Sequence, residues 1–291
     1  MRKLPALFFI TACFLVQPQV EGQSRGTGTQ NLVNDALSQM EKAFNDMDTE
    51  FTPEDEYYLG RAVAANILAV YKPYTRNPEM TQYLNRICQT LAINSSRPVA
   101  YNGYHVIILD SPEFNAFASS GGHIFVTKGL VQAATSEDML AAVIAHELAH
   151  IILKHSIEII NDMKLSGEMS AMADKAADLA GRDSSAVQRL MFFRNSVSKT
   201  MDTLMKNGYS QSQEFNADLE AMVLLAYAGY DPSALLDMLK VLQRVQRSQK
   251  GGFSTTHPSP GERIANVEKL RYRIMDTRKY RAPRFKNNSK F

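Results

Sequence analysis

The chain has 291 residues, 45% of them apolar, and a formal net charge of +2. A chain of this length and composition can bury a substantial core, which predicts one globular domain. Its nearly balanced charge excludes a role in which the whole protein acts as a polycation, so we expect no nucleic-acid partner.

The N-terminus has the pattern of a secretory signal peptide. Arg2 and Lys3 precede an apolar run from Leu4 to Val16, and compact residues precede a cut after Gly22. Beyond this run the sequence has no stretch of 18 or more consecutive apolar residues, the length that a membrane-spanning helix requires. We therefore predict a signal peptide over 1–22, a flexible polar linker over 23–51, no transmembrane span in the mature chain, and a periplasmic location.

The two cysteines bear on anchoring and on cross-links. The stretch that ends at Cys13 also resembles a bacterial lipobox, in which Cys13 would be lipidated and would attach the chain to the outer membrane. The apolar run continues past Cys13, however, and this favours cleavage after Gly22. Cys88 would then be the one remaining cysteine, and we expect it to be a buried, unreactive thiol rather than half of a disulfide.

The predicted helices and strands begin at Thr52. Thr52 is a good N-cap and Pro53 a good first helical residue, so one helix should run from Pro53 to about Val70, with a second over 78–93. The β-branched runs 104–109 and 122–127 predict two strands of a small sheet. Farther along, the apolar period predicts helices over 136–153, 157–207, 211–228, 232–249 and 259–274. This pattern indicates an α+β fold that is mainly helical, followed by a solvated basic tail over 276–291.

The stretch His146-Glu147-Leu-Ala-His150 carries the chemistry. On a helix, residues four apart point the same way, so the two imidazoles can converge on one metal ion. Glu147 lies about 100° round the helix axis and can reach a metal-bound water without binding the metal itself. Neutral imidazole suits zinc, and a carboxylate is a competent base toward such a water.

Two other interpretations of this stretch are a chance match on a buried helix and a purely structural zinc site. Buried histidines and glutamates without partners are costly, which argues against chance. Closed structural sites favour cysteine ligands, which this chain has in short supply. We therefore favour a catalytic metal site.

A catalytic zinc needs a further protein ligand, and Glu214 is the best candidate downstream. Glu214 and Asp218 lie four apart on one face of the predicted helix 211–228. An acid pair of this kind usually forms a solvated surface, but the upstream motif favours Glu214 as the third ligand. Asp218 would then accept a hydrogen bond from a ligating imidazole and orient it.

Together these residues resemble peptidase family M48, in the glutamate-ligated branch of the zincins, over most of the chain from Thr52 to Leu270. The resemblance rests on five ordered pieces of sequence: Asn115–Gly122 followed by Ile124-Phe-Val, His146–His150, Glu214–Asp218, Ala228–Pro232 and His257–Arg263. It implies a zincin-type peptidase domain over 52–275 with a small sheet beside the metal-binding helix. It also implies one Zn²⁺ per chain, held by His146, His150 and Glu214, with Glu147 as the general base.

The resemblance further implies that a strand near Gly122–Val126 pairs with an extended substrate. The candidate residues for this contact are Asn115, Ala116, Gly122 and Ile124. Within the family, the chain is similar to periplasmic members that act in outer-membrane protein quality control. In that group the histidine that matches His257 can approach the zinc as a fourth protein ligand and hold the enzyme latent; the alternative is a helix-capping histidine beside Pro258.

Some site features stay open at the level of sequence. Arg263 and His257 are both candidates for stabilising the oxyanion, because that step needs a cationic or donor group. Gln211, Asn216 and Leu219 depart from the residues of many family members, which alters the charge around the third ligand. The remaining histidines are expected on strand or helix surfaces and not as ligands: His105, His123 and His155.

The predicted reaction is the hydrolysis of peptide bonds in misfolded or envelope proteins by a metalloendopeptidase. The rival is a chaperone-like assembly factor for outer-membrane proteins that keeps its zinc site latent, a role that Met-rich helices over 157–207 would also serve. Expected partners are unfolded envelope proteins and the outer-membrane assembly machinery.

Overall fold

The computed structural model describes residues 51–165, 194–248, 257, 260–269 and 278–288. Apart from 51 and 194, these residues belong to the compact unit formed by Thr52–Ser166 and Asn195–Phe291. The predicted signal peptide, the lipidation site at Cys13 and nearly all of the predicted linker lie outside the described residues, as do residues 166–193 of the Met-rich stretch.

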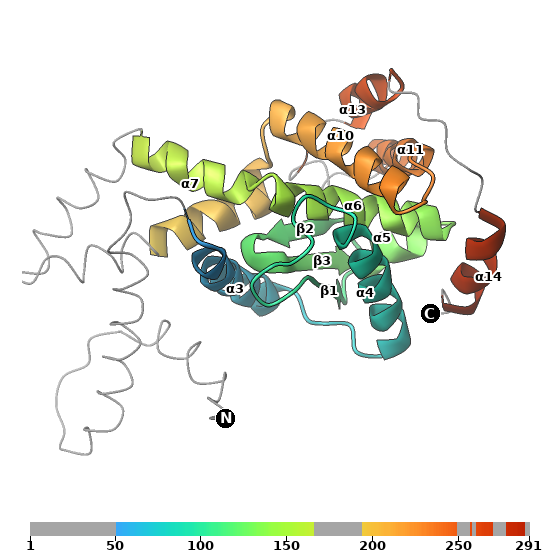
Figure 1. Ribbon diagram of the computed structural model, residues 1–291, viewed down its shortest axis with the longest axis horizontal. Coiled ribbons are helices and arrows are strands. Elements are labelled where there is room, and N and C mark those ends of the chain that lie inside the picture. Colours follow the sequence, from blue (N-terminus) through green and yellow to red (C-terminus); the bar gives the residue numbers. More distant parts are fainter. Residues whose placement is uncertain (1–50, 166–193, 249–256, 258–259, 270–277, 289–291) are drawn as a thin grey trace, which may run out of the picture. The chain divides into compact units, whose positions relative to one another are not determined.

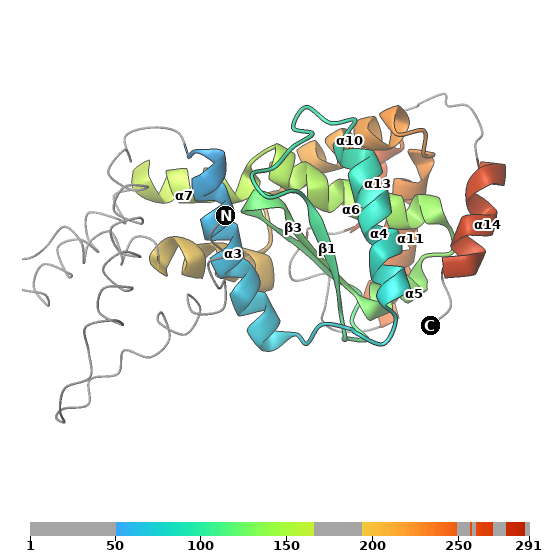
Figure 2. The ribbon, with the colours of Figure 1, turned by 60° about the horizontal axis from the view of Figure 1, so that its bottom comes forward.

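A small sheet of three strands lies at the centre of the described unit (Figures 1 and 2). The strands are β1 (His105–Leu109), β2 (Ala116–Ser119) and β3 (His123–Thr127), in the order β1-β3-β2. β3 pairs parallel with β1 and antiparallel with β2. The two strands predicted from sequence are confirmed. β2 was not predicted, because its sequence Ala-Phe-Ala-Ser has neither β-branched residues nor an alternating pattern.

Helices with the following bounds pack against this sheet or against one another. They are α3 (Pro53–Val70), α4 (Pro78–Ala92), α5 (Lys128–Ala133), α6 (Glu137–Ile152), α7 (His155–Leu165), α10 (Gln211–Tyr227), α11 (Ser233–Ser248), α13 (Pro260–Val267) and α14 (Arg278–Asn288), with the short helical segments η1 (Ser120–Gly122) and η2 (Thr203–Asn207). The mainly helical α+β class predicted from sequence is confirmed.

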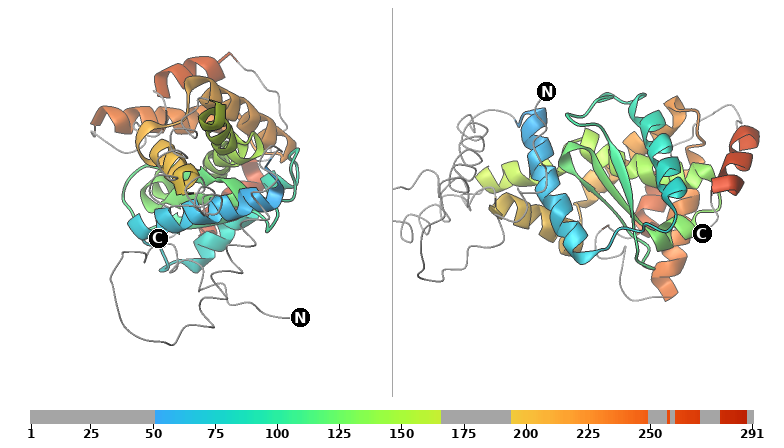
Figure 3. Two further views of the ribbon diagram at one scale, coloured as in Figure 1. Left: turned by 90° about the vertical axis from the view of Figure 1, so that its left-hand side faces the viewer. Right: turned by 90° about the horizontal axis from the view of Figure 1, so that it is seen from below.

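Side chains alternate between the two faces of the sheet, and each face has its own apolar cluster. Ile108, Ile124 and Val126 join the cluster that contains α4 and α6 residues. Phe117 and Phe125 join a second cluster with Val63 and Ile67 of α3. Figure 3 shows α3 and α4 flanking the strands. The sheet is therefore covered on both sides, which explains why its strands are buried.

α3 approaches the sheet closely at a glycine. The helix begins as predicted, with Thr52 accepting a hydrogen bond from the backbone of Asp55 in a capping box. Gly60 then passes the backbone of η1: a Cβ at this position would lie 1.6 Å from the carbonyl oxygen of Ser120. Only glycine permits this contact, which fixes α3 against the end of β2.

α6 is the central helix of the fold. It packs against β2, α4, α10 and α11, and all of its residues except Val143 are buried. Among the described residues, one helical stretch, Glu137–Asp162, is long and apolar enough to span a membrane by length and composition, with a mean hydropathy of 1.3. In this fold 89% of its most apolar window is buried, so the core accounts for its composition.

α14 lies within the predicted solvated basic tail, and most of its described side chains are exposed, but two of its arginines attach it to α6. Arg281 is 5% exposed, forms a 2.6 Å ion pair with Asp138 and donates to the carbonyl of Gly229. Arg284 forms a 2.6 Å ion pair with Glu137. Both carboxylates are buried at the start of α6 and require counter-charges, which α14 supplies from 143 to 147 residues away.

Cys88 is a buried free thiol on α4, as predicted. Burial raises the pKa of this thiol to about 12, so it stays protonated and unreactive at neutral pH.

Candidate metal centre

α6 brings His146 and His150 together, one turn apart on the same face. Ser136 caps the helix by accepting from the backbone of Met139, so the phase of the helix is set ten residues before His146. The two Nε2 atoms lie 3.2 Å apart, and both imidazoles are buried. The spacing of four residues thus produces the pair of donors that the sequence predicts.

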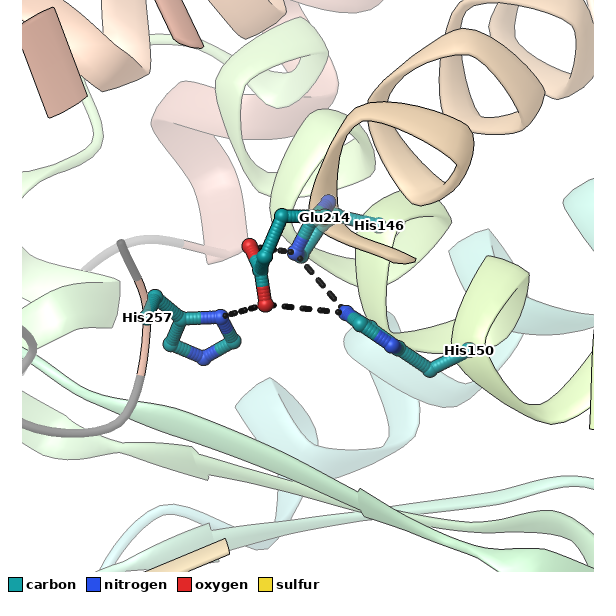
Figure 4. Close-up of side chains that lie close together, drawn as sticks. All are labelled: His146, His150, Glu214 and His257. Carbon is teal, nitrogen blue, oxygen red and sulfur yellow. Dashed lines mark hydrogen bonds and ion pairs between the residues drawn. The ribbon is translucent and has the colours of Figure 1, made fainter. Parts of the chain in front are cut away.

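Glu214 enters from the first turn of α10 and meets both histidines (Figure 4). Its Oε2 lies 3.4 Å from the Nε2 of His146, and its Oε1 lies 3.5 Å from the Nε2 of His150. His257 approaches from the other side, with its Nδ1 2.7 Å from the Oε1 of Glu214. One donor atom from each of these four buried residues lies within 4.8 Å of the others.

The distances within this group fit a small metal ion. A tetrahedral zinc with ligand distances near 2.0–2.1 Å would separate its ligands by about 3.3 Å. The three distances among His146, His150 and Glu214 are 3.2, 3.4 and 3.5 Å. Two imidazoles and a carboxylate also form a typical donor set for a divalent transition metal. The described residues therefore provide a site that can hold one metal ion.

The electrostatics of the site follow from burial and from nearby charges. Burial alone would raise the pKa of the Glu214 carboxyl, but His257 and Arg263 outweigh it and hold this pKa well below its usual range. Burial and Arg263 lower the pKa of His146, but the carboxylates of Asp218 and Glu214 outweigh them and raise it to about 9. Burial lowers the pKa of His150. The site thus keeps an anionic carboxylate among imidazoles, which favours a bound cation.

Asp218 and Arg263 lie directly behind the donors. The Oδ1 of Asp218 lies 3.1 Å from the Nδ1 of His146 and can accept its proton, which leaves Nε2 to face the other donors. Arg263 donates from Nε to Asp218 at 2.8 Å, and its Nη1 lies 3.0 Å from Glu214. Arg263 is 1% exposed and its guanidinium is paired with two carboxylates. This position favours a role in orienting the donors; oxyanion stabilisation by Arg263 stays a prediction.

Glu147 is buried on the same helix, and burial raises the pKa of its carboxyl, against the opposing effect of His257 and His146. Together with His146 and Arg263, it lines a hollow that is partly open to solvent. The other lining side chains are apolar and come from α5, α6 and α11 as well as β2: Leu130, Ala142, Val143, Leu235, Met238, Leu239, Leu242 and Ala116. The wall of the hollow beside Glu147 is therefore mainly apolar.

The expectation that the strand near Gly122–Val126 pairs with substrate is wrong. β3, which contains Ile124, is the central strand, and both of its edges are occupied by β1 and β2. Ile124 is fully buried, and Gly122 lies at the turn before β3 with φ 101°. Among the described strands, β2 is the edge strand on this side, and it packs against α6. Asn115 and Ala116, at the start of β2, are therefore the candidates that keep their position beside the site.

The outer edge of β2 is not paired with another of the described strands. Thr127 donates its N–H to the carbonyl of Asn115, so residues 115, 117 and 119 face β3, whereas Ala116 and Ala118 face outward. The Ala116 N–H donates to the side-chain Oδ1 of Asn115 at 2.9 Å.

The expectation that His155 is a surface residue is wrong. His155 is 2% exposed, and its Nδ1 lies 2.8 Å from the Nδ1 of His150. The expectation assumed that one helix continues from His150 to His155. Instead, Lys154 adopts φ 58° and the chain turns before α7 begins. His105 is exposed as expected, and His123 is half-buried and stacked on Tyr57.

Tyr209 is a residue of the site that the sequence did not suggest. Its ring stacks on His150 with centroids 4.1 Å apart, and its hydroxyl lies 2.9 Å from Ser156. No local pattern marks Tyr209, because it lies just before the N-cap of α10 and reaches His150 only through the fold.

A helix that carries two histidines four apart, a buried glutamate from a second helix and a small sheet beside them define a zincin-type metallopeptidase domain. Residues 78–271 match the sequence profile of peptidase family M48, and the chain belongs to this family.

Curated relatives of the chain include several proteases. The chain is 25% identical over 197 residues to the Beta-barrel assembly-enhancing protease of Escherichia coli (strain K12), covering 67% of this chain and 39% of that protein. It is 28% identical over 233 residues to the Mitochondrial metalloendopeptidase OMA1 of Schizosaccharomyces pombe, covering 78% of this chain and 63% of that protein. It is 27% identical over 192 residues to the Metalloprotease LoiP of Escherichia coli (strain K12), covering 66% of this chain and 70% of that protein. The match thus spans about two fifths of the length of the assembly-enhancing protease.

Proposed function

We propose that the protein is a zinc-dependent endopeptidase of the cell envelope. The observation that carries this proposal is the buried group of His146, His150 and Glu214, whose mutual distances suit a tetrahedral metal, with Glu147 on the same helix. Membership of peptidase family M48 and relatives named as metalloproteases support it.

His146, His150 and Glu214 would hold the metal. When bound, zinc would polarise the scissile carbonyl and lower the pKa of a water molecule. Glu147 takes a proton from the attacking water as the new C–O bond forms, and delivers it to the nitrogen as the C–N bond breaks. Asp218 holds the Nδ1 proton of His146, and Arg263 holds Asp218 in place. This division leaves Glu147 as the residue that moves protons.

Unfolded or misfolded envelope proteins are the proposed substrates. The outer edge of β2 can pair with an extended backbone, and the surface beside Glu147 is lined mainly by apolar side chains. Unfolded chains offer extended backbone and exposed apolar side chains. The predicted signal peptide over 1–22 supports export to the periplasm, with lipidation of Cys13 as the alternative route to the outer membrane. Relatives named as Beta-barrel assembly-enhancing proteases support a partner in the outer-membrane assembly machinery.

Removal of the metal tests the proposal. The purified protein is expected to degrade casein, an unfolded substrate, to stop after treatment with EDTA, and to recover when Zn²⁺ is added back. A tightly folded protein of similar size, incubated in parallel, is expected to remain intact. Casein cleavage that continues after the metal has been removed, with metal content checked by elemental analysis, would rule out the zinc mechanism.

His257 supports a latent state of the same site. Its Nδ1 lies 2.7 Å from Glu214, so four protein donors meet where a catalytic zinc keeps one position for water. His257→Ala is therefore expected to raise the rate of casein cleavage while zinc remains bound. His105→Ala, which changes an exposed histidine outside the site, is the control and should leave the rate unchanged. Equal or lower activity in His257→Ala would contradict latency.

The second candidate function is a chaperone or assembly factor for outer-membrane proteins. The same approach of His257 to Glu214 favours it, because a site closed by four protein donors binds metal without hydrolysing peptide bonds. If wild type and His257→Ala both bind zinc and neither cuts casein, this binding role becomes the leading proposal.

A further inference from the structure

At the start of α7, His155 contacts His150. The two Nδ1 atoms lie 2.8 Å apart, and both rings are buried. A hydrogen bond between two imidazole nitrogens needs one N–H and one lone pair, so exactly one of these nitrogens carries the proton. The other contacts of the two rings determine which one.

The contacts of the other ring nitrogen of His150, Nε2, determine its tautomer. Its Nε2 lies 3.2 Å from the Nε2 of His146 and 3.5 Å from Glu214, among the proposed metal ligands. To offer a lone pair there, neutral His150 must carry its proton on Nδ1 and donate it to His155. His155 then accepts on Nδ1 and carries its own proton on Nε2.

The two ligating imidazoles are therefore held from behind in the same way by different groups. Asp218 accepts from the Nδ1 of His146 at 3.1 Å, and His155 accepts from the Nδ1 of His150 at 2.8 Å. Tyr209 stacks on His150 and contacts Ser156, the residue after His155. The first two residues of α7 thus fix both the hydrogen bond and the ring plane of His150.

The turn that places His155 is itself held by ion pairs. Lys154 adopts a left-handed conformation that a residue with a side chain adopts only at a cost. Its Nζ lies 3.1 Å from the buried carboxylate of Glu56, which also pairs with Arg97 at 2.8 Å. Arg97 in turn donates to the carbonyl of Ile151 near the end of α6. These contacts from α3 and from the loop after α4 stabilise the turn.

We propose that His155 is a positioning residue that fixes the tautomer and orientation of His150 and thereby raises the affinity of the site for zinc. This inference rests on the proposed role of His150 as a metal ligand. A carboxylate behind His146 and a neutral imidazole behind His150 give the site two hydrogen-bond acceptors while only one of them adds a negative charge.

Two variants of nearly identical shape test this inference. Asn and Leu have the same branching, but Asn can place an acceptor oxygen where the Nδ1 of His155 lies, and Leu cannot. His155→Leu is expected to bind Zn²⁺ about 10–100-fold more weakly than wild type, the usual loss when the partner of a ligating histidine is removed. His155→Asn is expected to retain most of the affinity.

The readout is zinc affinity, measured by competition with a chromophoric chelator, and the thermal midpoint of the metal-free proteins in EDTA reports folding separately. Zinc affinity of His155→Leu equal to that of wild type would overturn the proposal. So would an equal loss in both variants, because it would assign His155 to packing alone. If wild type binds no zinc, the proposed function itself fails. If wild type binds zinc but His155→Leu and His155→Asn lose affinity equally, the proposed function stands and this inference fails.

Discussion

Replacing Glu147 by glutamine is expected to lower the rate of casein cleavage by about 10²–10⁴-fold, the contribution of a general base. Gln has the same size as Glu and can still accept hydrogen bonds, but it cannot take a proton from water. Glu147 is 2% exposed and does not belong to the group of four donors, so its replacement leaves that group intact. The variant should therefore fold and bind zinc as wild type does while losing its activity.

The matched comparison is Glu214→Gln, which changes the same chemical group at a proposed ligand. This variant is expected to lose zinc as well as activity, because Glu214 contacts both His146 and His150. Zinc content and cleavage rate are measured on each protein. A Glu147→Gln variant that cuts casein at the wild-type rate, or that loses its activity only because it has lost its zinc, would remove Glu147 from the role of general base.

Replacing Arg263 by methionine is expected to lower the free energy of unfolding by about 3–5 kcal/mol, the usual cost of removing one partner of a buried ion pair. Asp218 and Glu214 are both fully buried, and the guanidinium of Arg263 pairs with each of them. Met fills most of the same space but leaves two buried carboxylates without this counter-charge. The loss should appear as a shift of the denaturant midpoint, measured in EDTA so that metal binding does not contribute.

Lys128→Met is the control for this experiment. Lys128 and Asp110 form an ion pair at 2.6 Å, but both side chains are partly exposed, 25% and 33%. Removing one partner of such a surface pair should cost at most about 1 kcal/mol. If Arg263→Met costs no more than Lys128→Met, Arg263 does not stabilise the carboxylates behind the donors. Arg263→Met is also expected to bind zinc more weakly, because Asp218 would no longer be held against His146.

Local rules were enough to predict the parts of the site that lie on single helices. The spacing of four residues in an α-helix brings His146 and His150 together, and it places Glu214 and Asp218 on one face of α10. The caps at Thr52, Ser136 and Ser210 begin α3, α6 and α10 at or within one residue of the predicted starts. These features depend on residues within one or two turns of each other, so they can be read along the chain.

Tertiary structure decided which of the candidate residues meet. The pairing order makes β2 an edge strand and places β3 between β1 and β2, and no local pattern of either strand encodes this order. The left-handed turn at Lys154, held by Glu56 of α3, brings His155 into contact with His150. Helical spacing alone had predicted that His155 points away from the metal site. Arg281 and Arg284 of α14 pair with Asp138 and Glu137. An unpaired buried carboxylate is costly, and the fold brings these two distant arginines close enough to pair with them.

The sequence by itself therefore determined the family and the class of enzyme, and it predicted the helix that bears the candidate ligands, because these depend on short-range spacing and on residue type. The edge proposed to accept a peptide, the groups proposed to orient each imidazole and the docking of the C-terminal helix were decided only by the tertiary structure. Each of these depends on contacts between residues far apart in the chain, which burial and charge pairing select and which no local period encodes.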